Sequence, residues 1–311
     1  MESAKTFRGL IFFGSGDFAN LVFNFFIEKG VRFEALVTLP PRPRGRGRKL
    51  LDPEIKKTAL EAGIRVFQPE NPNRQDFLSL LEDLSPDFIV LSDYGKILKK
   101  GLLELPRYYP LNIHPSLLPR YRGAAPIERA MMNCDRETGV TLMVMDEGLD
   151  TGPIVDQATL EIGETEIKTE LMVRLAHIGV ELTLKNIEPL KNGTRQPVPQ
   201  TGVPSYAPKI TKDELYINWN ETAEKIRCRI NALSYKPGAK GKIGPLELKI
   251  LRARVSEKMG GNPGTVHIQE DRLFVEATDL QVEILEIQPP GKRVMSASDF
   301  IRGYSRKLHT V

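Results

Sequence analysis

The sequence contains few cysteines, histidines and tryptophans: two, four and one, respectively, among 311 residues. Cys134 and Cys228 stand in none of the spacings typical of zinc or redox motifs, so we expect free thiols that pack as small apolar groups. The histidines are scattered without an HxxxH or HxH pair, and we therefore expect no metal site.

Long apolar runs are also missing. No stretch approaches the roughly 18 apolar residues that a membrane-spanning helix requires. The N-terminus, MESAKTFRGLIFFG, passes from a polar start directly into a short strand and lacks the layout of a signal peptide. We expect a cytoplasmic protein with no membrane partner, whose thiols stay reduced.

Charge of one sign is not in large excess, since 44 Lys and Arg face 40 Asp and Glu, a net charge of +4. A balance this small does not by itself indicate a nucleic-acid partner. Its placement is more informative, because 18 basic residues oppose 13 acidic ones from Lys209 onward, against 26 and 27 before it.

A second concentration of positive charge lies in the segment 41–49, which holds five cations, two prolines and two glycines but no acidic residue. Such a segment cannot bury itself, so we expect a mobile cationic loop. Most charge runs are solvated linkers, but this one would also suit a phosphate backbone.

The first half of the chain alternates strand-like and helix-like runs, beginning with the apolar stretch 7–13. This alternation predicts an α/β doubly wound, mostly parallel, Rossmann-like domain. The turn at Gly14–Ala19 has the GxGxxA pattern of a dinucleotide fingerprint, so a nicotinamide oxidoreductase is one alternative. However, the second strand, at 33–38, runs into Leu39-Pro40 instead of ending on the acidic residue that holds a ribose. We therefore interpret the glycines as a tight turn.

Residues 191–208 lose periodicity and carry four prolines and two glycines, which is typical of a linker. Beyond them, a helix at 221–233 precedes four evenly spaced strand-like runs: 246–255, 264–269, 273–278 and 282–287. This spacing favours a C-terminal OB-like β-barrel domain, a fold that often binds oligonucleotides. Ser296 is expected to cap a final helix. The predicted ranges are a first domain at 1–190, a linker at 191–208 and an OB-like domain at 209–311.

The residues best suited to chemistry lie at the end of a predicted strand, Leu111–His114. The strand turns Asn112 and His114 to one face and ends at Pro115, at the edge where open α/β sheets usually bind ligands. The amide can hold a developing oxyanion and the imidazole can transfer a proton near neutral pH. Asp150, in the string DEGLDTGPI, could face His114, favour one tautomer and stabilise the imidazolium. Each residue also fits a purely structural role.

The strings around these residues resemble a known family. NIHPSLLPRYRG and the distal LDTGP are similar to the folate-dependent formyltransferases, and so are RGAAPIERA and ETGVTLMVMDEGLDTGPI. PRPRGRGRKL and PPGKRVMSASDFIRG extend the resemblance to nearly the whole chain. It implies transfer of a formyl group from the co-substrate 10-formyltetrahydrofolate to the α-amino group of methionine on initiator tRNA, a step of translation initiation. We also expect a monomer.

The resemblance implies a role for each matching residue. Asn112, His114 and Asp150 would be catalytic, with direct attack by the amine and no covalent enzyme intermediate, in agreement with the lack of a recognisable activated Ser or Cys. The folate-binding residues would be Tyr94, Ile97, Leu98, Leu111, Ser116, Leu117, Leu118, Pro119 and Asp146. The tRNA-binding residues would be Arg42, Arg44, Arg46, Arg48 and Lys49. Two departures stand out, because Lys96 replaces an expected apolar residue and Ala239-Lys240-Gly241 replaces a frequent aromatic.

Other functions share some of these features. Formylation of a sugar amine or of glycinamide ribotide, or hydrolysis of the folate, would use the same three polar residues but would not require the basic segment or the C-terminal domain. A non-catalytic RNA-binding protein would need only the β-barrel. Arg120 and Arg122 could anchor the folate, contact an RNA phosphate or remain solvated.

Overall fold

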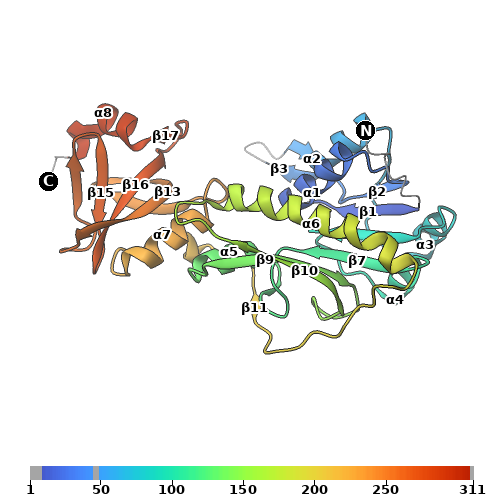
Figure 1. The fold of residues 1–311 in the computed structure, drawn as a ribbon. Coiled ribbons are helices and arrows are strands. Elements are labelled where there is room, and N and C mark those ends of the chain that lie inside the picture. Colours follow the sequence, from blue (N-terminus) through green and yellow to red (C-terminus); the bar gives the residue numbers. More distant parts are fainter. Residues whose placement is uncertain (1–8, 45–48, 309–311) are drawn as a thin grey trace. The chain divides into compact units, whose positions relative to one another are not determined.

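The computed structural model describes residues 9–44 and 49–308, which form two compact units (Figure 1). The first unit consists of the chain up to Arg122, Gly139–Leu160 and Met172–Tyr206. The second consists of Gly123–Thr138, Glu161–Leu171 and the chain from Ala207 onward. Each unit is therefore built from segments that alternate along the chain, whereas the predicted domain ranges are contiguous.

The first unit is an α/β structure. Its elements are β1 (Leu10–Gly14), α1 (Asp17–Glu28), β2 (Ala35–Val37), β3 (Arg42–Arg44), β4 (Lys49–Leu51), α2 (Glu54–Glu61), β5 (Arg65–Phe67), α3 (Gln75–Glu82), β6 (Phe88–Ser92), α4 (Lys100–Leu103) and β7 (Tyr109–His114). Five further elements begin in one unit and end in the other: β8 (Arg122–Gly123), β9 (Glu137–Val144), β10 (Ile154–Glu161), α6 (Lys168–Lys191) and β11 (Tyr206–Ala207).

The central sheet has seven strands in the order β10-β9-β7-β6-β1-β2-β5. Strands β5, β2, β1, β6 and β7 are parallel neighbours, and β9 runs antiparallel to β7. The mostly parallel, Rossmann-like prediction is therefore confirmed. Because β6 and β7 are parallel, with Leu91 opposite Asn112, their carboxyl ends meet at the same edge of the sheet.

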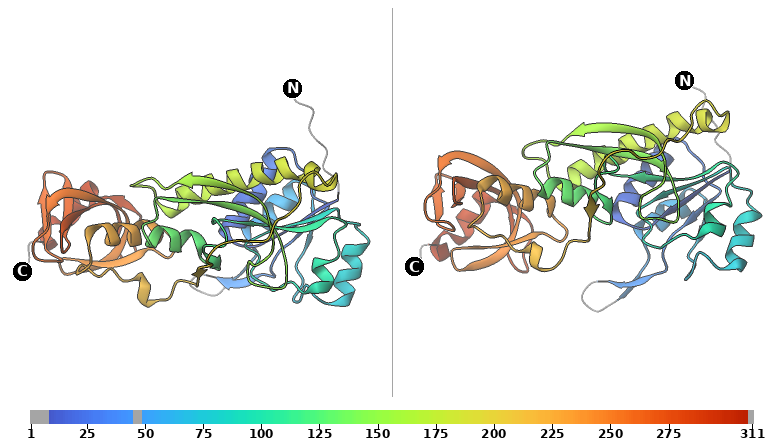
Figure 2. Two further views of the ribbon diagram at one scale, coloured as in Figure 1. Left: turned by 60° about the horizontal axis from the view of Figure 1, so that its bottom comes forward. Right: turned by 90° about the horizontal axis from the view of Figure 1, so that it is seen from below.

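Helices cover both faces of this sheet (Figures 1 and 2). On one face, Phe12 of β1 packs against Phe23 and Phe26 of α1. On the same face α6 approaches β7 so closely that a Cβ on Gly179 would lie 2.5 Å from Ile113. The opposite face buries an apolar cluster that joins β1 and β6 to α3 and α4. The alternation along β7 turns Asn112 and His114 toward this second face.

The described flanks of the expected cationic loop form an antiparallel hairpin, β3 with β4, that extends away from the sheet (Figure 2). Arg42 pairs with Leu51 and Arg44 with Lys49, and the side chain of Arg42 is exposed. Arg46 and Arg48 lie outside the described residues. The prediction of a loop for the whole segment is thus wrong for its described ends, which are strands that hydrogen-bond to each other.

The second unit is an antiparallel β structure with helices packed on it. Its complete elements are α5 (Pro126–Met132), the 3₁₀ turn η1 (Asp213–Leu215), α7 (Ala223–Ala232), β12 (Ala239–Ile243), β13 (Leu246–Met259), β14 (Val266–Gln269), β15 (Arg272–Glu276), β16 (Leu280–Gln288), β17 (Met295–Ser296) and α8 (Ala297–Leu308). The sheet order is β12-β13-β16-β15-β14, with β17 added beside β16. The four predicted strands are present, and β12 is an additional strand that the sequence analysis missed.

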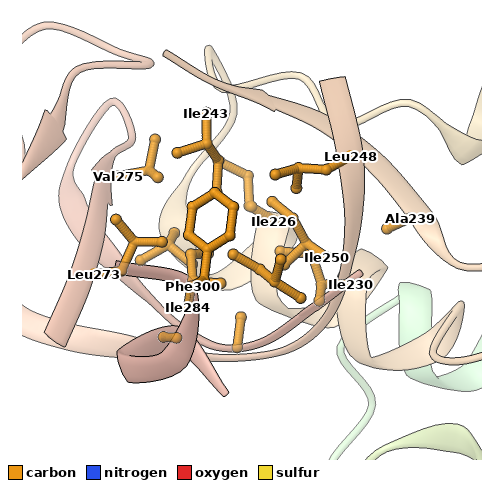
Figure 3. Packing of buried hydrophobic residues seen from close by; sticks show 14 of the residues in the cluster. Ile226, Ile230, Ala239, Ile243, Leu248, Ile250, Leu273, Val275, Ile284 and Phe300 are labelled. Carbon is orange, nitrogen blue, oxygen red and sulfur yellow. The ribbon is translucent and has the colours of Figure 1, made fainter. Parts of the chain in front are cut away.

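The core of the second unit lies between its sheet and two helices. Phe300 of α8 is fully buried in the same apolar cluster as Ile226 and Ile230 of α7 and residues from four strands (Figure 3). Ser296 caps α8 as predicted, because the Asp299 backbone N–H donates to its Oγ at 3.1 Å.

A partly buried ion pair also stabilises the second unit. The Arg129 guanidinium donates to Glu214, with one contact of 3.1 Å from Nη2 to Oε2. Together with hydrogen bonds from Thr211, it lowers the pKa of Glu214 to about 2. Arg129 thus connects α5 to the η1 turn.

Both cysteines are joined in a disulfide, so the prediction of free thiols is wrong. Cys134 follows α5 and Cys228 lies in α7, with 5.5 Å between their Cα atoms, a separation that suits a disulfide. The two residues are 94 positions apart, and packing brings them together in a way that no local spacing reveals.

Within residues 9–44 and 49–308, no helix is both long enough and apolar enough to cross a bilayer.

Candidate active site

Asn112 and His114 stand at the carboxyl end of β7, in the centre of the first unit's sheet. Their side chains are nearly buried, with 7% and 4% of each residue exposed. The ladder to β9 continues as far as His114, opposite Thr141. Asn112 pairs with β6 and β9, and His114 pairs with β9, so a strand of the sheet rather than a loop positions both side chains.

Asp150 comes from the loop between β9 and β10. It adopts a left-handed backbone conformation, with φ of 52°, which residues other than glycine seldom adopt outside turns and functional sites. The loop is closed on itself by Asp146, whose carboxylate accepts hydrogen bonds from the Thr151 hydroxyl at 2.7 Å and the Gly148 N–H at 3.0 Å. These contacts present the side chain of Asp150 toward the end of β7.

The structure brings the three predicted catalytic residues together. Asn112 Nδ2 donates to Asp150 Oδ1 at 3.4 Å. His114 Nδ1 lies 3.7 Å from Asp150 Oδ2, which is too long for a direct hydrogen bond but close enough for electrostatic attraction once the imidazole carries a proton. A proton donor that enters between the imidazole and the carboxylate would contact both groups.

The second ring nitrogen of His114 determines its tautomer. His114 Nε2 lies 3.0 Å from the backbone oxygen of Tyr121. A carbonyl oxygen can only accept, so Nε2 must carry a hydrogen. In the neutral ring Nδ1 is then the unprotonated nitrogen, and it faces Asp150. The arrangement can take a proton at Nδ1, stabilise the resulting cation with the carboxylate, and offer an amide N–H from Asn112 to a developing negative charge.

Comparison with known families agrees with this chemistry. The formyl transferase family matches residues 8–187, and the formyl transferase C-terminal domain matches residues 209–305. The chain belongs to the formyl transferase family.

Relatives of this formyl transferase are similar over their full length. A methionyl-tRNA formyltransferase of Thermodesulfovibrio yellowstonii is 41% identical over 303 residues, which is 97% of each chain. One from Dictyoglomus thermophilum is 40% identical over 307 residues, covering 95% of this chain and 96% of the relative.

Solved structures of formyltransferases share the fold. An N-formyltransferase from Helicobacter canadensis, in complex with folinic acid and dTDP-3-aminofucose, superimposes with a TM-score of 0.65 at 20% identity, covering 91% of this chain and 100% of that one. A methionyl-tRNA formyltransferase from Clostridium thermocellum gives 0.53 at 16%, covering 90% and 99%. At these identities the likeness shows the fold alone.

The predicted folate residues of this formyl transferase occupy different environments. Tyr94 is 1% exposed and packs edge-on against Phe13, and its burial raises the pKa of its phenol. Leu98 belongs to the same core, whereas Ile97 is 79% exposed at the same edge of the sheet. Leu111 is fully buried and its side chain points to the face opposite Asn112, so only its backbone could reach a ligand beside the catalytic residues.

The unexpected Lys96 contacts the loop that follows β5. Its Nζ donates to the backbone oxygens of Pro69, at 3.0 Å, and Glu70. The ammonium group therefore fastens two loops together.

Of the other predicted folate residues, Asp146 lies in the loop between β9 and β10, and four form the loop after β7. Ser116 and Leu118 are buried, Leu117 and Pro119 are half-buried, and the Ser116 hydroxyl donates to the Arg120 oxygen at 2.7 Å. Sequence reasoning missed Thr141, whose hydroxyl donates to the Ser116 oxygen at 2.6 Å and accepts from the Leu118 N–H at 3.1 Å. The signal that could have identified Thr141 is its position opposite His114 in the pairing of β7 with β9.

Arg122 has a structural contact, which was not among the three possibilities that the sequence left open. Its Nε and Nη2 donate to Gln200 Oε1 at 3.2 and 2.7 Å. Arg120 lies over the ring of Tyr121, at 5.3 Å from its centroid.

The glycine turn after β1 is occupied by Asp93 of the same chain. The N–H groups of Ser15 and Gly16 both donate to the backbone oxygen of Asp93 at 3.1 Å. A Cβ on Gly16 would lie 1.6 Å from Asp93 Oδ2, so the glycine makes room for a carboxylate. A dinucleotide pyrophosphate needs such N–H groups and is repelled by such a carboxylate, which argues against the nicotinamide alternative.

Proposed function

We propose that this protein transfers the formyl group of 10-formyltetrahydrofolate to the α-amino group of methionyl initiator tRNA, as a cytoplasmic monomer acting in translation initiation. The observation that carries the proposal is the convergence of Asn112, His114 and Asp150 at one end of β7. The relatives that are about 40% identical over nearly the whole chain support this acceptor.

The three residues would act in sequence on the amine and the formyl carbon. The neutral amine attacks the carbon directly, so no protein nucleophile is needed. Asn112 donates its amide hydrogen to the oxygen as negative charge develops there, a contribution of about 3 kcal/mol in comparable oxyanion sites. His114 takes the amine proton at Nδ1 and later returns a proton to the departing nitrogen, a role that typically accelerates transfer by about 100- to 10,000-fold.

The loops at this edge of the sheet suit a formyl donor with an aromatic ring. Ile97 and Leu149 are 79% and 60% exposed, and the Lys100 N–H donates to Glu147 Oε1 at 3.3 Å, which connects their two loops. Exposed apolar side chains beside buried polar groups suit a flat pterin ring. The proposed folate contacts are Tyr94, Ile97, Leu98, Leu111, Ser116, Leu117, Leu118, Pro119 and Asp146.

The tRNA is proposed to bind the basic segment and the second unit. The exposed Arg42 begins the β3–β4 hairpin, and the proposed contacts are Arg42, Arg44, Arg46, Arg48 and Lys49. In the second unit, Lys240 Nζ lies 5.0 Å from the ring centroid of the exposed Tyr216, so a cation and an aromatic ring are available together where RNA bases could stack. Affinity resting on such cations should fall steeply with salt.

An acceptor panel tests the proposal. Purified protein, 10-formyltetrahydrofolate and one of four acceptors are mixed: methionyl-tRNA, free methionine, an amino sugar nucleotide or glycinamide ribotide. Formylation of methionyl-tRNA alone is expected. Formylation of a small acceptor in preference, or release of formate without an acceptor, would overturn the proposal.

A pair of histidine variants assigns the activity to the site. His114→Ala should lose formylation, whereas His177→Ala should retain it, because His177 is a half-exposed residue of α6 whose ring contacts Phe25 and Glu181. Full activity of His114→Ala would exclude the proposed role of its imidazole.

A further inference from the structure

The segment 198–205, predicted to be part of a linker, is bound to the loops that form the site. Val198 and Ile154 exchange two backbone hydrogen bonds, of 2.7 and 2.8 Å, so the segment continues as a short strand-like addition beside β10. This contact lies part-way along the extended path that the chain follows from the end of α6 to β11 (Figure 1). This anchoring fixes the position of Gln200, two residues further on.

The Gln200 amide connects the Asp150 loop to Arg122. Its Nε2 donates to the backbone oxygens of Asp150 and Gly152, both at 2.8 Å. Its Oε1 accepts from Nε and Nη2 of Arg122. A primary amide has two hydrogens to donate and two lone pairs to offer, so all four are used. Arg122 also fixes the orientation of the amide, because only the oxygen can face a guanidinium.

Ser205, five residues later, holds the other partner of the catalytic imidazole. Its Oγ accepts from the Tyr121 N–H at 2.9 Å, and its backbone oxygen accepts from the Arg122 N–H at 2.9 Å. Its own N–H donates to the Pro119 oxygen at 3.2 Å. Tyr121 is the residue whose carbonyl faces His114 Nε2. One short segment therefore contacts the residues that face both ring nitrogens of His114.

We infer that Gln200 is a positioning residue for formyl transfer, which holds the Asp150 carboxylate against His114 Nδ1 by fixing the backbone on both sides of Thr151. The inference rests on the proposed function for its kinetic consequence. The left-handed backbone conformation of Asp150 is one that persists only where the surrounding structure holds it, and Gln200 holds it at the Asp150 carbonyl itself. A displacement of about 1 Å in such a group can cost about 100-fold in rate.

Kinetics of Gln200 variants test the inference. Gln200→Ala should lower kcat for methionyl-tRNA by about 10- to 100-fold while the KM values for tRNA and folate stay within about twofold. Gln200→Glu should lose as much, because its carboxylate keeps the Arg122 contact but cannot donate to the two carbonyls. Gln196→Ala is the matched control four residues earlier, since the exposed Gln196 donates to the Gly193 oxygen within its own turn. Wild-type kcat in Gln200→Glu would overturn the inference.

A double-mutant cycle shows whether Gln200 acts through Asp150. In an Asp150→Ala background, Gln200→Ala should lower kcat by less than about twofold further, because the group that it positions is already gone. Equal fold losses in both backgrounds would show that Gln200 acts independently of Asp150, and would overturn the inference.

Hydrogen exchange of the free protein separates this inference from the proposed function. Gln200→Ala should increase amide exchange in the loop 146–153, whereas Gln196→Ala should leave it unchanged. Unchanged exchange in Gln200→Ala would refute the positioning role even if the wild-type protein formylates methionyl-tRNA. Conversely, increased exchange would support that role even if the acceptor proves to be another amine.

Discussion

Replacement of Asp150 by asparagine removes one negative charge from the site and little else. The side chain keeps its shape and can still hydrogen-bond to Asn112, but no longer stabilises a proton on His114. Coulomb attraction across the observed 3.7 Å is about 1 kcal/mol in water and about 4.5 kcal/mol at an effective dielectric constant of 20. The side chains of His114 and Asp150 are only 5% and 15% exposed, so the effect should lie toward the larger value, at about 2–4 kcal/mol.

This energy corresponds to a decrease in kcat of about 30- to 1,000-fold. Single-turnover formylation of saturating methionyl-tRNA measures it, and tRNA affinity should not change, because the charge acts mainly in the transition state. Asp156→Asn is a matched control: that carboxylate is 17% exposed and bonds to Lys185 and Asn186 instead. It should lower stability but leave kcat within about twofold. A kcat within threefold of wild type for Asp150→Asn would refute the electrostatic role.

Three stability predictions follow from packing, cross-linking and charge. Gly179→Ala in α6 should lower the free energy of unfolding, measured in urea, by about 1–3 kcal/mol, because its Cβ would clash with an isoleucine of β7. Gly303→Ala in α8 is the control: its Cβ would meet nothing within 4 Å, so the same measurement should show an increase of about 0.5–1 kcal/mol. Reduction of the Cys134–Cys228 bond should lower the free energy of unfolding by about 4.6 kcal/mol, because the unfolded chain regains the entropy of a loop closed over 94 positions. Equal urea midpoints with and without reductant would contradict this. The pKa of Glu214 is lowered to about 2 from 4.5 by its arginine partner, so its stabilisation is present above pH 4.5 and lost as the pH falls toward 2. The free energy of unfolding of the wild type should therefore exceed that of Glu214→Gln by about 1–3 kcal/mol at pH 6, and the two values should converge near pH 2. A difference that does not change with pH would exclude the linkage.

The sequence was sufficient to predict the sheet and the three polar residues because each depends on a local pattern. Alternation and a following proline place Asn112 and His114 at a strand end, and turn chemistry places Asp150 in a loop. Parallel order brings the carboxyl ends of β6 and β7 to one edge of the sheet. Asp150, however, follows β9, which runs antiparallel to β7, so its proximity to His114 depends on the fold of the β9–β10 loop.

The supporting contacts could not be predicted in the same way. Gln200 meets the Asp150 loop from a segment without periodicity, and the group that fixes the His114 tautomer is a backbone oxygen, which any residue at position 121 would supply. The Cys134–Cys228 pair was missed for a related reason, since their approach depends on how α5 packs against α7. Polar contacts between irregular segments leave no pattern in the residues themselves.

The alternation of segments between the two units has a practical consequence for dissecting the protein. The chain changes unit five times, after residues 122, 138, 160, 171 and 206. A fragment that starts at residue 209 would lose α5, leave Cys228 as a lone thiol, and deprive the Lys236 carbonyl of its 2.6 Å contact with Lys168. Truncation at residue 209 therefore removes parts of the second unit itself, and RNA affinity is properly measured on the undivided polypeptide.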